Sequence, residues 1–222
     1  MTQHYDEYSK KISPDLRVWV SELSEFEDEI EKLKDTDPFV SKFENLKRRR
    51  EFLHGRLLLR SGIQSLTGSD PGWMIPRQYG PPPLPAGVSG SLTHSGPYAA
   101  VALLPSQSET KVGIDLEVPM TEAQAEKILG QIQKRSVKIT GSLERYFSCP
   151  REQAQAGFSV FEALQKTLPQ FSILNRVSEF TFELNENLFH ARCLDYHWKG
   201  FITLKPDYAL AIAILTQRVI QP

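Results

Sequence analysis

Apolar residues between Asp37 and Ile63 recur at the spacing of a helix. The positions that set this period are Phe39, Phe43, Leu46, Leu53 and Leu57. Asp37 is a suitable N-cap residue, and Pro38 fits the first helical position, where a missing N–H costs nothing. The pattern therefore predicts one long helix that begins behind Asp37.

Two further helices are predicted in the second half of the chain. Thr121 is a suitable N-cap with Glu122 just inside, so a helix is expected from there to about Ser136. Another helix is expected over about 153–168, where Pro169 would end it.

Segments with period-two alternation, or with short apolar runs between turn residues, predict strands. These segments cover 17–23, 88–93, 98–104, 111–118, 179–184, 188–195, 198–204 and 208–215. Each half of the chain thus places a helix before antiparallel strands, which indicates an α+β protein with two similar lobes. We expect the lobes at 1–109 and 110–222, each a long helix packed on a small, mostly antiparallel sheet.

The composition narrows the class of protein. Of 222 residues, 26 are Lys or Arg and 27 are Asp or Glu, so the net charge of −1 gives no global attraction to nucleic acid or membranes. A hydrophobic content of 40% is ordinary for a globular protein and argues against disorder. The stretch 78–108 has no Asp, Glu, Lys or Arg but is rich in proline, so it is not a continuous transmembrane helix.

The cysteines and the N-terminus bear on the compartment. Cys149 and Cys193 are the two cysteines, and their spacing matches neither a zinc site nor a disulfide framework. The first residues are polar and acidic, without the apolar core of an export signal. We therefore expect a cytoplasmic protein.

The segment VGIDLE, 112–117, carries the strongest chemical signal. Successive side chains of a strand point to opposite faces, so Ile114 and Leu116 are expected in the core, with Asp115 and Glu117 together on the other face. Two neighbouring carboxylates are costly in a partly buried place unless a cation offsets them. The alternative is an exposed strand edge with two solvated acids.

Glu162 and Lys166 form a second signal, because they stand four residues apart on a predicted helix in the favourable acid-then-base order. Such a pair is usually a surface ion pair. Phe158, Phe161 and Leu164 make this helix apolar, however, which favours a partly buried acid and lysine.

The segment GSLTHSG, 90–96, is the third signal, a strand that runs into a polar turn. Its hydroxyls, its backbone N–H groups and a protonated His94 could all donate to a phosphate, while a purely structural histidine is the alternative. The basic run from Lys47 to Arg50 is interpreted as a solvated helix face, because consecutive charges point around a helix.

In their order along the chain, 90–96, then 112–117, then 158–166, the three signals together resemble the phosphopantetheinyl transferase superfamily. Length and the two-lobed pattern are similar to its larger, monomeric class, the type that serves surfactin and enterobactin synthetases. The resemblance implies two lobes in a pseudo-twofold arrangement. It also implies Mg²⁺-dependent transfer of 4′-phosphopantetheine from coenzyme A to a serine of an acyl or peptidyl carrier protein. The N-terminal lobe would bind the adenine and 3′-phosphate of coenzyme A, and the C-terminal lobe would hold the metal and the catalytic helix.

The resemblance also implies roles for individual residues of the C-terminal lobe. Asp115, Glu117 and Glu162 match the metal-binding acids of the family, whose hard oxygens suit Mg²⁺. Lys166 matches the lysine that contacts the substrate's phosphates. Glu162 is the candidate general base, directly or through a metal-bound water.

In the N-terminal lobe, Thr93 and His94 match the turn that holds the 3′-phosphate of coenzyme A. Tyr79 and Gly80 match the start of the segment that packs on its adenine. Two arginines, Arg56 and Arg77, are further candidate phosphate partners.

The chain departs from the family pattern at two positions. The family commonly has Gly-Lys-Pro where this chain has Gly80-Pro81-Pro82, and commonly a lysine where it has Phe161. Both departures remove a cation from a site for a polyanion. They keep open an alternative function, a catalytically weakened or inactive coenzyme A-binding or regulatory protein of the same fold. A Mg²⁺-dependent phosphohydrolase has little support, because no water-activating histidine accompanies the acids.

Overall fold

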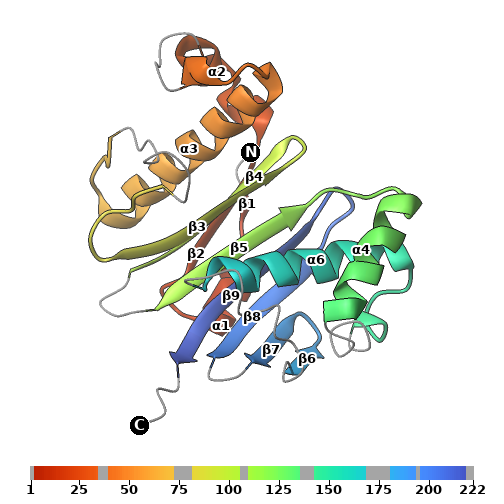
Figure 1. Ribbon diagram of the computed structural model, residues 1–222. Helices are drawn as coiled ribbons and strands as arrows, with labels where there is room; N and C mark the ends of the chain where they lie inside the picture. Colours follow the sequence, from red (N-terminus) through yellow and green to blue (C-terminus); the bar gives the residue numbers. More distant parts are fainter. Residues whose placement is uncertain are drawn as a thin grey trace. The chain divides into compact units, whose positions relative to one another are not determined.

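The computed structural model describes residues 3–34, 40–72, 82–105, 110–135, 143–168, 181–193 and 196–218. The chain divides into two compact units, Met1–Ser108 and Glu109–Pro222. Within each unit, helices pack on an antiparallel sheet (Figure 1), so the predicted α+β class is confirmed. Over these described ranges, no helix is long and apolar enough to cross a membrane.

The N-terminal unit has a four-stranded sheet in the order β1-β2-β4-β3. Its strands are β1 (Gln3–His4), β2 (Arg17–Glu22), β3 (Val88–Ser95) and β4 (Tyr98–Pro105). Its helical segments are α1 (Asp6–Ile12), η1 (Leu23–Phe26), α2 (Glu27–Leu33), η2 (Val40–Lys42) and α3 (Leu46–Thr67). The strands predicted from alternation at 17–23, 88–93 and 98–104 are therefore confirmed, whereas α1 and α2 were not predicted.

Helix α3 begins later than predicted. It starts at Leu46 behind Asn45, whose side-chain oxygen accepts hydrogen bonds from the N–H groups of Lys47 (2.9 Å) and Arg48 (3.3 Å). A separate 3-10 turn, η2, precedes it, so the prediction of one helix running from Asp37 is wrong. Asp37 and Pro38 themselves lie outside the described residues. Asn45 satisfies the N–H groups that a helix start leaves without partners, and this fixes the start at Leu46.

Close packing of α3 on the sheet depends on two glycines of the helix. A Cβ at Gly55 would lie 3.2 Å from the Leu92 side chain, and one at Gly62 would lie 3.2 Å from that of Leu103. Around them, Trp19, Leu58, Leu59, Ile63, Ala99, Val101 and Leu103 form the buried core. Since Leu92 contacts α3, alternation along β3 also turns His94 toward this helix.

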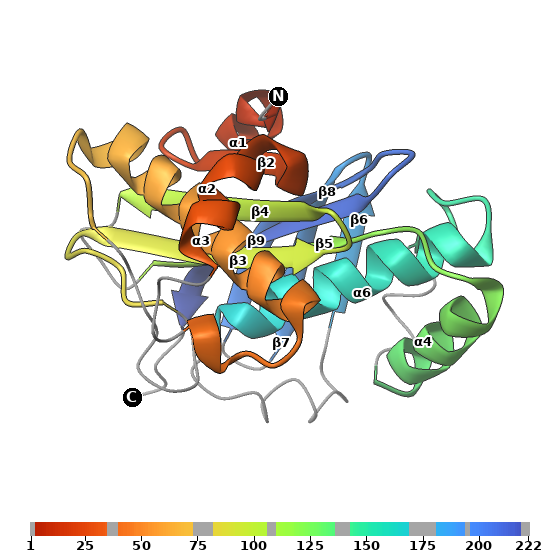
Figure 2. The same ribbon diagram turned by 90° about the horizontal axis from the view of Figure 1, so that it is seen from above.

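The C-terminal unit has a five-stranded antiparallel sheet in the order β5-β9-β8-β7-β6. Its strands are β5 (Lys111–Glu117), β6 (Thr181–Asn185), β7 (Leu188–Cys193), β8 (Tyr196–Leu204) and β9 (Ala209–Arg218). Its helices are α4 (Glu122–Arg135) and α6 (Pro150–Lys166). Both predicted helices and the predicted strands of this half are confirmed within a few residues, and Figure 2 shows α4 beside α6.

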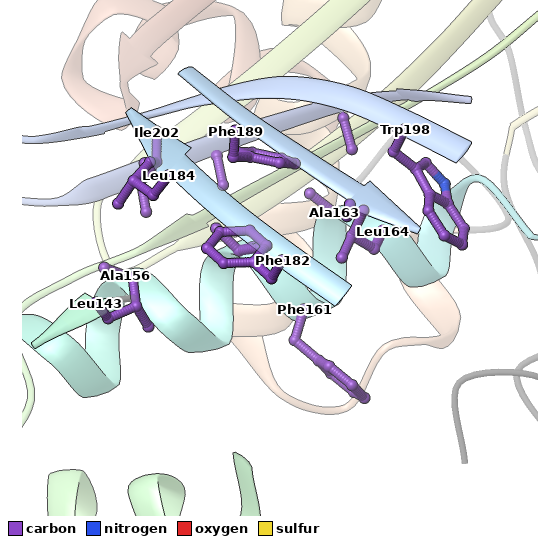
Figure 3. Close-up of a cluster of buried hydrophobic side chains, with 14 of the residues drawn as sticks. Leu143, Ala156, Phe161, Ala163, Leu164, Phe182, Leu184, Phe189, Trp198 and Ile202 are labelled. Carbon is purple, nitrogen blue, oxygen red and sulfur yellow. The ribbon is translucent and has the colours of Figure 1, made fainter. Parts of the chain in front are cut away.

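The core of this unit lies between α6 and the sheet. Figure 3 shows apolar side chains of α6 facing those of β6, β7 and β8. Phe161, where the family pattern has a cation, is 3% exposed and belongs to this cluster. The position is therefore a core position, which explains an apolar residue there.

Candidate functional site

Helix α6 lies directly against the edge strand β5, and Gly113 makes this possible. A Cβ at Gly113 would lie 1.9 Å from the backbone oxygen of Ala163, so no side chain fits between strand and helix. Asp115 and Glu117 follow Gly113 at alternate positions, so they leave β5 on the same face, toward α6. The sequence predicted their shared face correctly.

Asp115 is buried, at 4% exposed, in contrast to the alternative of a solvated strand edge. Its Oδ1 is 2.7 Å from the Lys166 ammonium, which also donates a hydrogen bond of 2.9 Å to the Ile114 carbonyl. The cation that a buried carboxylate requires is therefore provided by the last turn of α6. The structure thus places Lys166 beside the first acid of the predicted metal set.

The turn that carries Lys166 is fixed by a buried hydrogen-bond chain. The indole N–H of Trp198 donates to the Thr167 hydroxyl (2.7 Å), and this hydroxyl donates to the Leu164 carbonyl (2.8 Å). Trp198 belongs to β8, so the C-terminal end of α6 is anchored to the sheet. This anchor fixes the backbone from which Lys166 reaches Asp115.

Glu117 and Glu162 are both half-buried, at the end of β5 and on α6. The amide of Gln155 donates to the Glu117 backbone carbonyl at 2.6 Å and ties the strand end to the helix. Among the described residues, no three His, Cys, Asp or Glu side chains are close enough together to hold a metal ion. The acids Asp115, Glu117 and Glu162 thus come from neighbouring elements without forming an assembled three-ligand site.

In the N-terminal unit, Thr93 and His94 are residues of β3, paired with Ala100 and Ala99 of β4. The turn itself is shorter than predicted, since Ser95 pairs with Tyr98 and leaves a two-residue loop in which Gly96 has a φ of 56°. Thr93 is buried and His94 is half-buried. As successive strand residues, their side chains leave the sheet on opposite faces.

His94 faces a buried carboxylate that the sequence analysis missed. Its Nδ1 is 3.9 Å from Oε2 of Glu51 on α3, and Glu51 is 7% exposed. Glu51 directly follows the basic run from Lys47 to Arg50, and no role was predicted for it. The signal that could have found it is its position one turn before Gly55, on the side of α3 that packs against β3.

Arg56 is a buried cation of the same helix, 6% exposed. Its guanidinium lies 4.8 Å from the centre of the Phe52 ring, and within the described part of the chain its Nε has no hydrogen-bond partner. Burial lowers the pKa of Arg56 to about 10, so it still carries its charge at neutral pH. A buried cation in such surroundings is suited to an anionic ligand.

A buried histidine, His54, lies about one turn after Glu51 on α3. Its Nε2 is 2.8 Å from the Ser21 hydroxyl, and the pair is closed to solvent. Burial, with a smaller effect from the charge of His94, lowers the pKa of His54 to about 4. His54 is therefore a neutral structural residue at neutral pH.

Three other candidates from the sequence, Arg77, Tyr79 and Gly80, lie outside the described residues, as does Pro81. The structure thus brings together Asp115 with Lys166 in one unit, and His94 with Glu51 in the other.

Comparison with known proteins gives one family. Residues 38–104 match the family model of the 4′-phosphopantetheinyl transferase N-terminal domain. This range includes α3, β3 and nearly all of β4, and with them Glu51, Arg56, Thr93 and His94. No curated protein matches the chain. Over residues 38–104, the N-terminal unit of this chain is therefore similar to the 4′-phosphopantetheinyl transferase N-terminal domain.

Proposed function

We propose that the protein transfers 4′-phosphopantetheine from coenzyme A to a serine of an acyl or peptidyl carrier protein. The family match over residues 38–104 is the observation that carries this proposal. The residues of β5 and α6 support it, since they supply acids and a lysine suited to a diphosphate and its metal ion. We expect a monomer acting in the cytoplasm, with no nucleic acid or membrane partner.

In this reaction the serine Oγ attacks the phosphorus that carries the pantetheine arm. A new P–O bond forms to the serine, and the bond from that phosphorus to the bridging oxygen of the diphosphate breaks. Adenosine 3′,5′-bisphosphate leaves with the bridging oxygen, and the serine proton goes to a base. The protein must therefore neutralise phosphate charge, orient the hydroxyl and accept a proton.

The acids of β5 suit Mg²⁺ in kind. Asp115 and Glu117 offer hard carboxylate oxygens from one face of the strand, and Glu162 comes from the helix packed on it. Mg²⁺ commonly binds one or two protein carboxylates and completes its shell with waters and substrate phosphates, so a preassembled three-acid cluster is not needed. When bound, the ion would offset charge on the diphosphate and on the leaving oxygen.

Lys166 would neutralise further charge on the diphosphate. Its ammonium, which is partly exposed at the end of α6, could contact a phosphate oxygen. Glu162 would accept the serine proton, directly or through a water.

In the N-terminal unit, we assign binding of the 3′-phosphate to His94 and Arg56, whereas Thr93, whose side chain leaves the sheet on the other face, remains a proposal from the resemblance. Arg56 supports this assignment most directly, because it is a buried cation that a phosphate would compensate. Arg77 as a phosphate partner, and Tyr79 and Gly80 at the adenine, remain proposals from the resemblance.

A coenzyme A-binding protein without transferase activity is the second candidate. Two observations favour it: Phe161 is a core residue and supplies no cation, and Lys166 already pairs with Asp115. Both functions require coenzyme A binding, so only turnover separates them.

The deciding experiment incubates the protein with coenzyme A, Mg²⁺ and several apo-carrier proteins, and follows the carrier mass. If the protein is a transferase, the carrier mass should increase by one phosphopantetheine arm. This increase should be absent with the Asp115→Asn enzyme, and absent for a carrier whose serine is changed to alanine. Coenzyme A binding without any mass change would support the second candidate. Failure to bind coenzyme A would contradict both.

A further inference from the structure

Glu51 has an unusual environment for a carboxylate. Its side chain is nearly buried, although it lies in the first turns of α3 among basic residues. Lys47 and Arg48 reach it from one turn earlier, with N–O distances of 3.8 Å and 3.1 Å. The Lys47 side chain is 77% exposed, and such surface pairs contribute roughly 0.3–0.5 kcal/mol on a helix. Those contacts alone give little reason to bury the carboxylate.

The third group at Glu51 comes from a different element. The Nδ1 of His94 approaches the same oxygen, Oε2, that Arg48 contacts, and the distance of 3.9 Å is suited to a charge interaction. A carboxylate near one imidazole nitrogen favours the ring orientation that turns this nitrogen toward it, and it favours the protonated form. The other nitrogen, Nε2, is then an N–H donor.

Three other titratable groups near His94 or its carboxylate partner lie on α3. Lys47 and Arg48 on α3 neutralise part of the Glu51 charge, and they thereby reduce its repulsion of an incoming phosphate. His54, also on α3, interacts electrostatically with His94 but is neutral at neutral pH. Glu51 is therefore the anion that acts on His94 from α3.

We propose that Glu51 is a positioning residue for His94, holding Nδ1 so that the charged ring presents Nε2–H to a phosphate monoester of the substrate. This inference rests on the proposed function for its ligand, the 3′-phosphate of coenzyme A. A monoester carries more charge than the diester linkages of the diphosphate, so a cationic donor favours substrates that have it. Glu51 would thus contribute to selection of coenzyme A over dephospho-coenzyme A.

The first test needs no substrate. The imidazole signals of His94 are followed by NMR through a pH titration in wild type and in Glu51→Gln, with His94→Gln used for assignment. We expect the His94 pKa to fall in Glu51→Gln. The matched control is Lys47→Gln, which removes a charge near the other oxygen of the same carboxylate. This variant should not lower the His94 pKa. An unchanged pKa in Glu51→Gln would overturn the proposal.

The second test measures affinity by calorimetry for coenzyme A, dephospho-coenzyme A and adenosine 3′,5′-bisphosphate. Glu51→Gln should weaken binding of the two ligands that carry a 3′-phosphate by about 3- to 10-fold, which is less than the full loss of a charge-assisted hydrogen bond because the His94 donor is still present. Glu51→Gln should leave the affinity for dephospho-coenzyme A unchanged. In the double variant, it should add little to the loss of affinity that His94→Gln causes alone. Equal losses for all three ligands would mean that Glu51 only supports the fold and would overturn the proposal.

The two tests separate this inference from the proposed function. If wild-type protein binds none of the ligands, the proposed function fails, while the NMR titration still decides whether Glu51 acts on His94. The apparent KM for coenzyme A supplies a third readout. It should rise as increasing pH removes the charge of His94, and this rise should begin at a lower pH in Glu51→Gln than in wild type. Should Glu51→Gln fold poorly, Glu51→Asp keeps the charge but shortens the reach, and an intermediate shift of the pKa is expected.

Discussion

Asp115 and Lys166 illustrate how a candidate metal ligand can also be a structural residue. The alternative of a solvated acid is wrong for Asp115, since the carboxylate is buried and paired with the lysine. Its removal is therefore expected to affect folding as well as the proposed metal binding. Activity data on this residue can be interpreted only beside stability data.

We expect Asp115→Ala to lower the free energy of unfolding by about 1–3 kcal/mol in metal-free buffer, because Lys166 loses its carboxylate partner. The double variant Asp115→Ala/Lys166→Met should lose less than the sum of the single variants. Urea denaturation of the four proteins measures this coupling. Additive losses would mean that the ion pair contributes nothing to stability.

Arg56 should behave in the opposite way. Because it is a buried cation whose Nε has no hydrogen-bond partner within the described residues, Arg56→Met should leave the ligand-free free energy of unfolding unchanged or higher. The same variant should bind coenzyme A at least about tenfold more weakly, as a charged hydrogen bond is worth roughly 1.5–3 kcal/mol. Thermal melting with and without coenzyme A measures both effects. A clear loss of ligand-free stability would indicate that Arg56 has a structural role instead.

At the scale of elements, the spacing between β5 and α6 depends on Gly113. Gly113→Ala would place a methyl group against the backbone of Ala163, and neither main chain can move aside without displacing the helix. We expect a loss of more than about 2 kcal/mol in unfolding free energy, or failure to fold. Chemical denaturation gives the comparison.

The matched control is Gly130→Ala on α4, where a Cβ would meet nothing within 4 Å. Alanine is the better helix former, so this variant should be more stable by up to about 1 kcal/mol. Similar losses in both variants would contradict the account of Gly113.

Much of the element structure could be predicted from alternation and turn residues, because these act locally. The predicted N-cap role of Thr121 at the start of α4 is confirmed, because its hydroxyl accepts a hydrogen bond from the Gln124 N–H (3.3 Å). The start of α3 could not be predicted, because two N-cap signals, at Asp37 and Asn45, lie within one periodic segment. Helix α2 was missed because a short, strongly acidic segment carries few apolar positions to set a period.

The pairing of groups across elements was harder to predict. The order of the motifs along the chain identified Asp115, Glu162, Lys166 and His94 as candidate site residues. It did not show that Lys166 contacts Asp115 on the strand. Nor did it identify Glu51, whose burial depends on packing between a helix and a strand that are distant in sequence. Such contacts are properties of the tertiary fold, which periodicity does not encode.

For the whole molecule, His54 should make the free energy of unfolding depend on pH in the acidic range. Burial lowers its pKa to about 4 in the folded protein, while the unfolded chain has the ordinary value of 6.5. Between these values the unfolded state binds more protons, so stability falls as pH decreases from 6.5 toward 4. The full effect is about 3 kcal/mol, as each pKa unit corresponds to about 1.4 kcal/mol.

The measurement is the free energy of unfolding as a function of pH for wild type and His54→Gln. Glutamine keeps a polar partner for Ser21 but does not titrate in this range. The variant should therefore show a shallower slope between pH 6.5 and 4, whatever its stability at pH 7. Parallel curves would assign the acid sensitivity to other groups.

The contact between Gly113 and Ala163 also has an evolutionary consequence. Gly113 cannot be replaced in evolution without disturbing the backbone packing against Ala163. Asp115, two positions later, could become asparagine without altering the space between strand and helix. Under the proposed function, a descendant of this protein could thus lose a metal ligand through one conservative change and keep its architecture. In this segment, the residue without a side chain is expected to tolerate less change than the charged residue beside it.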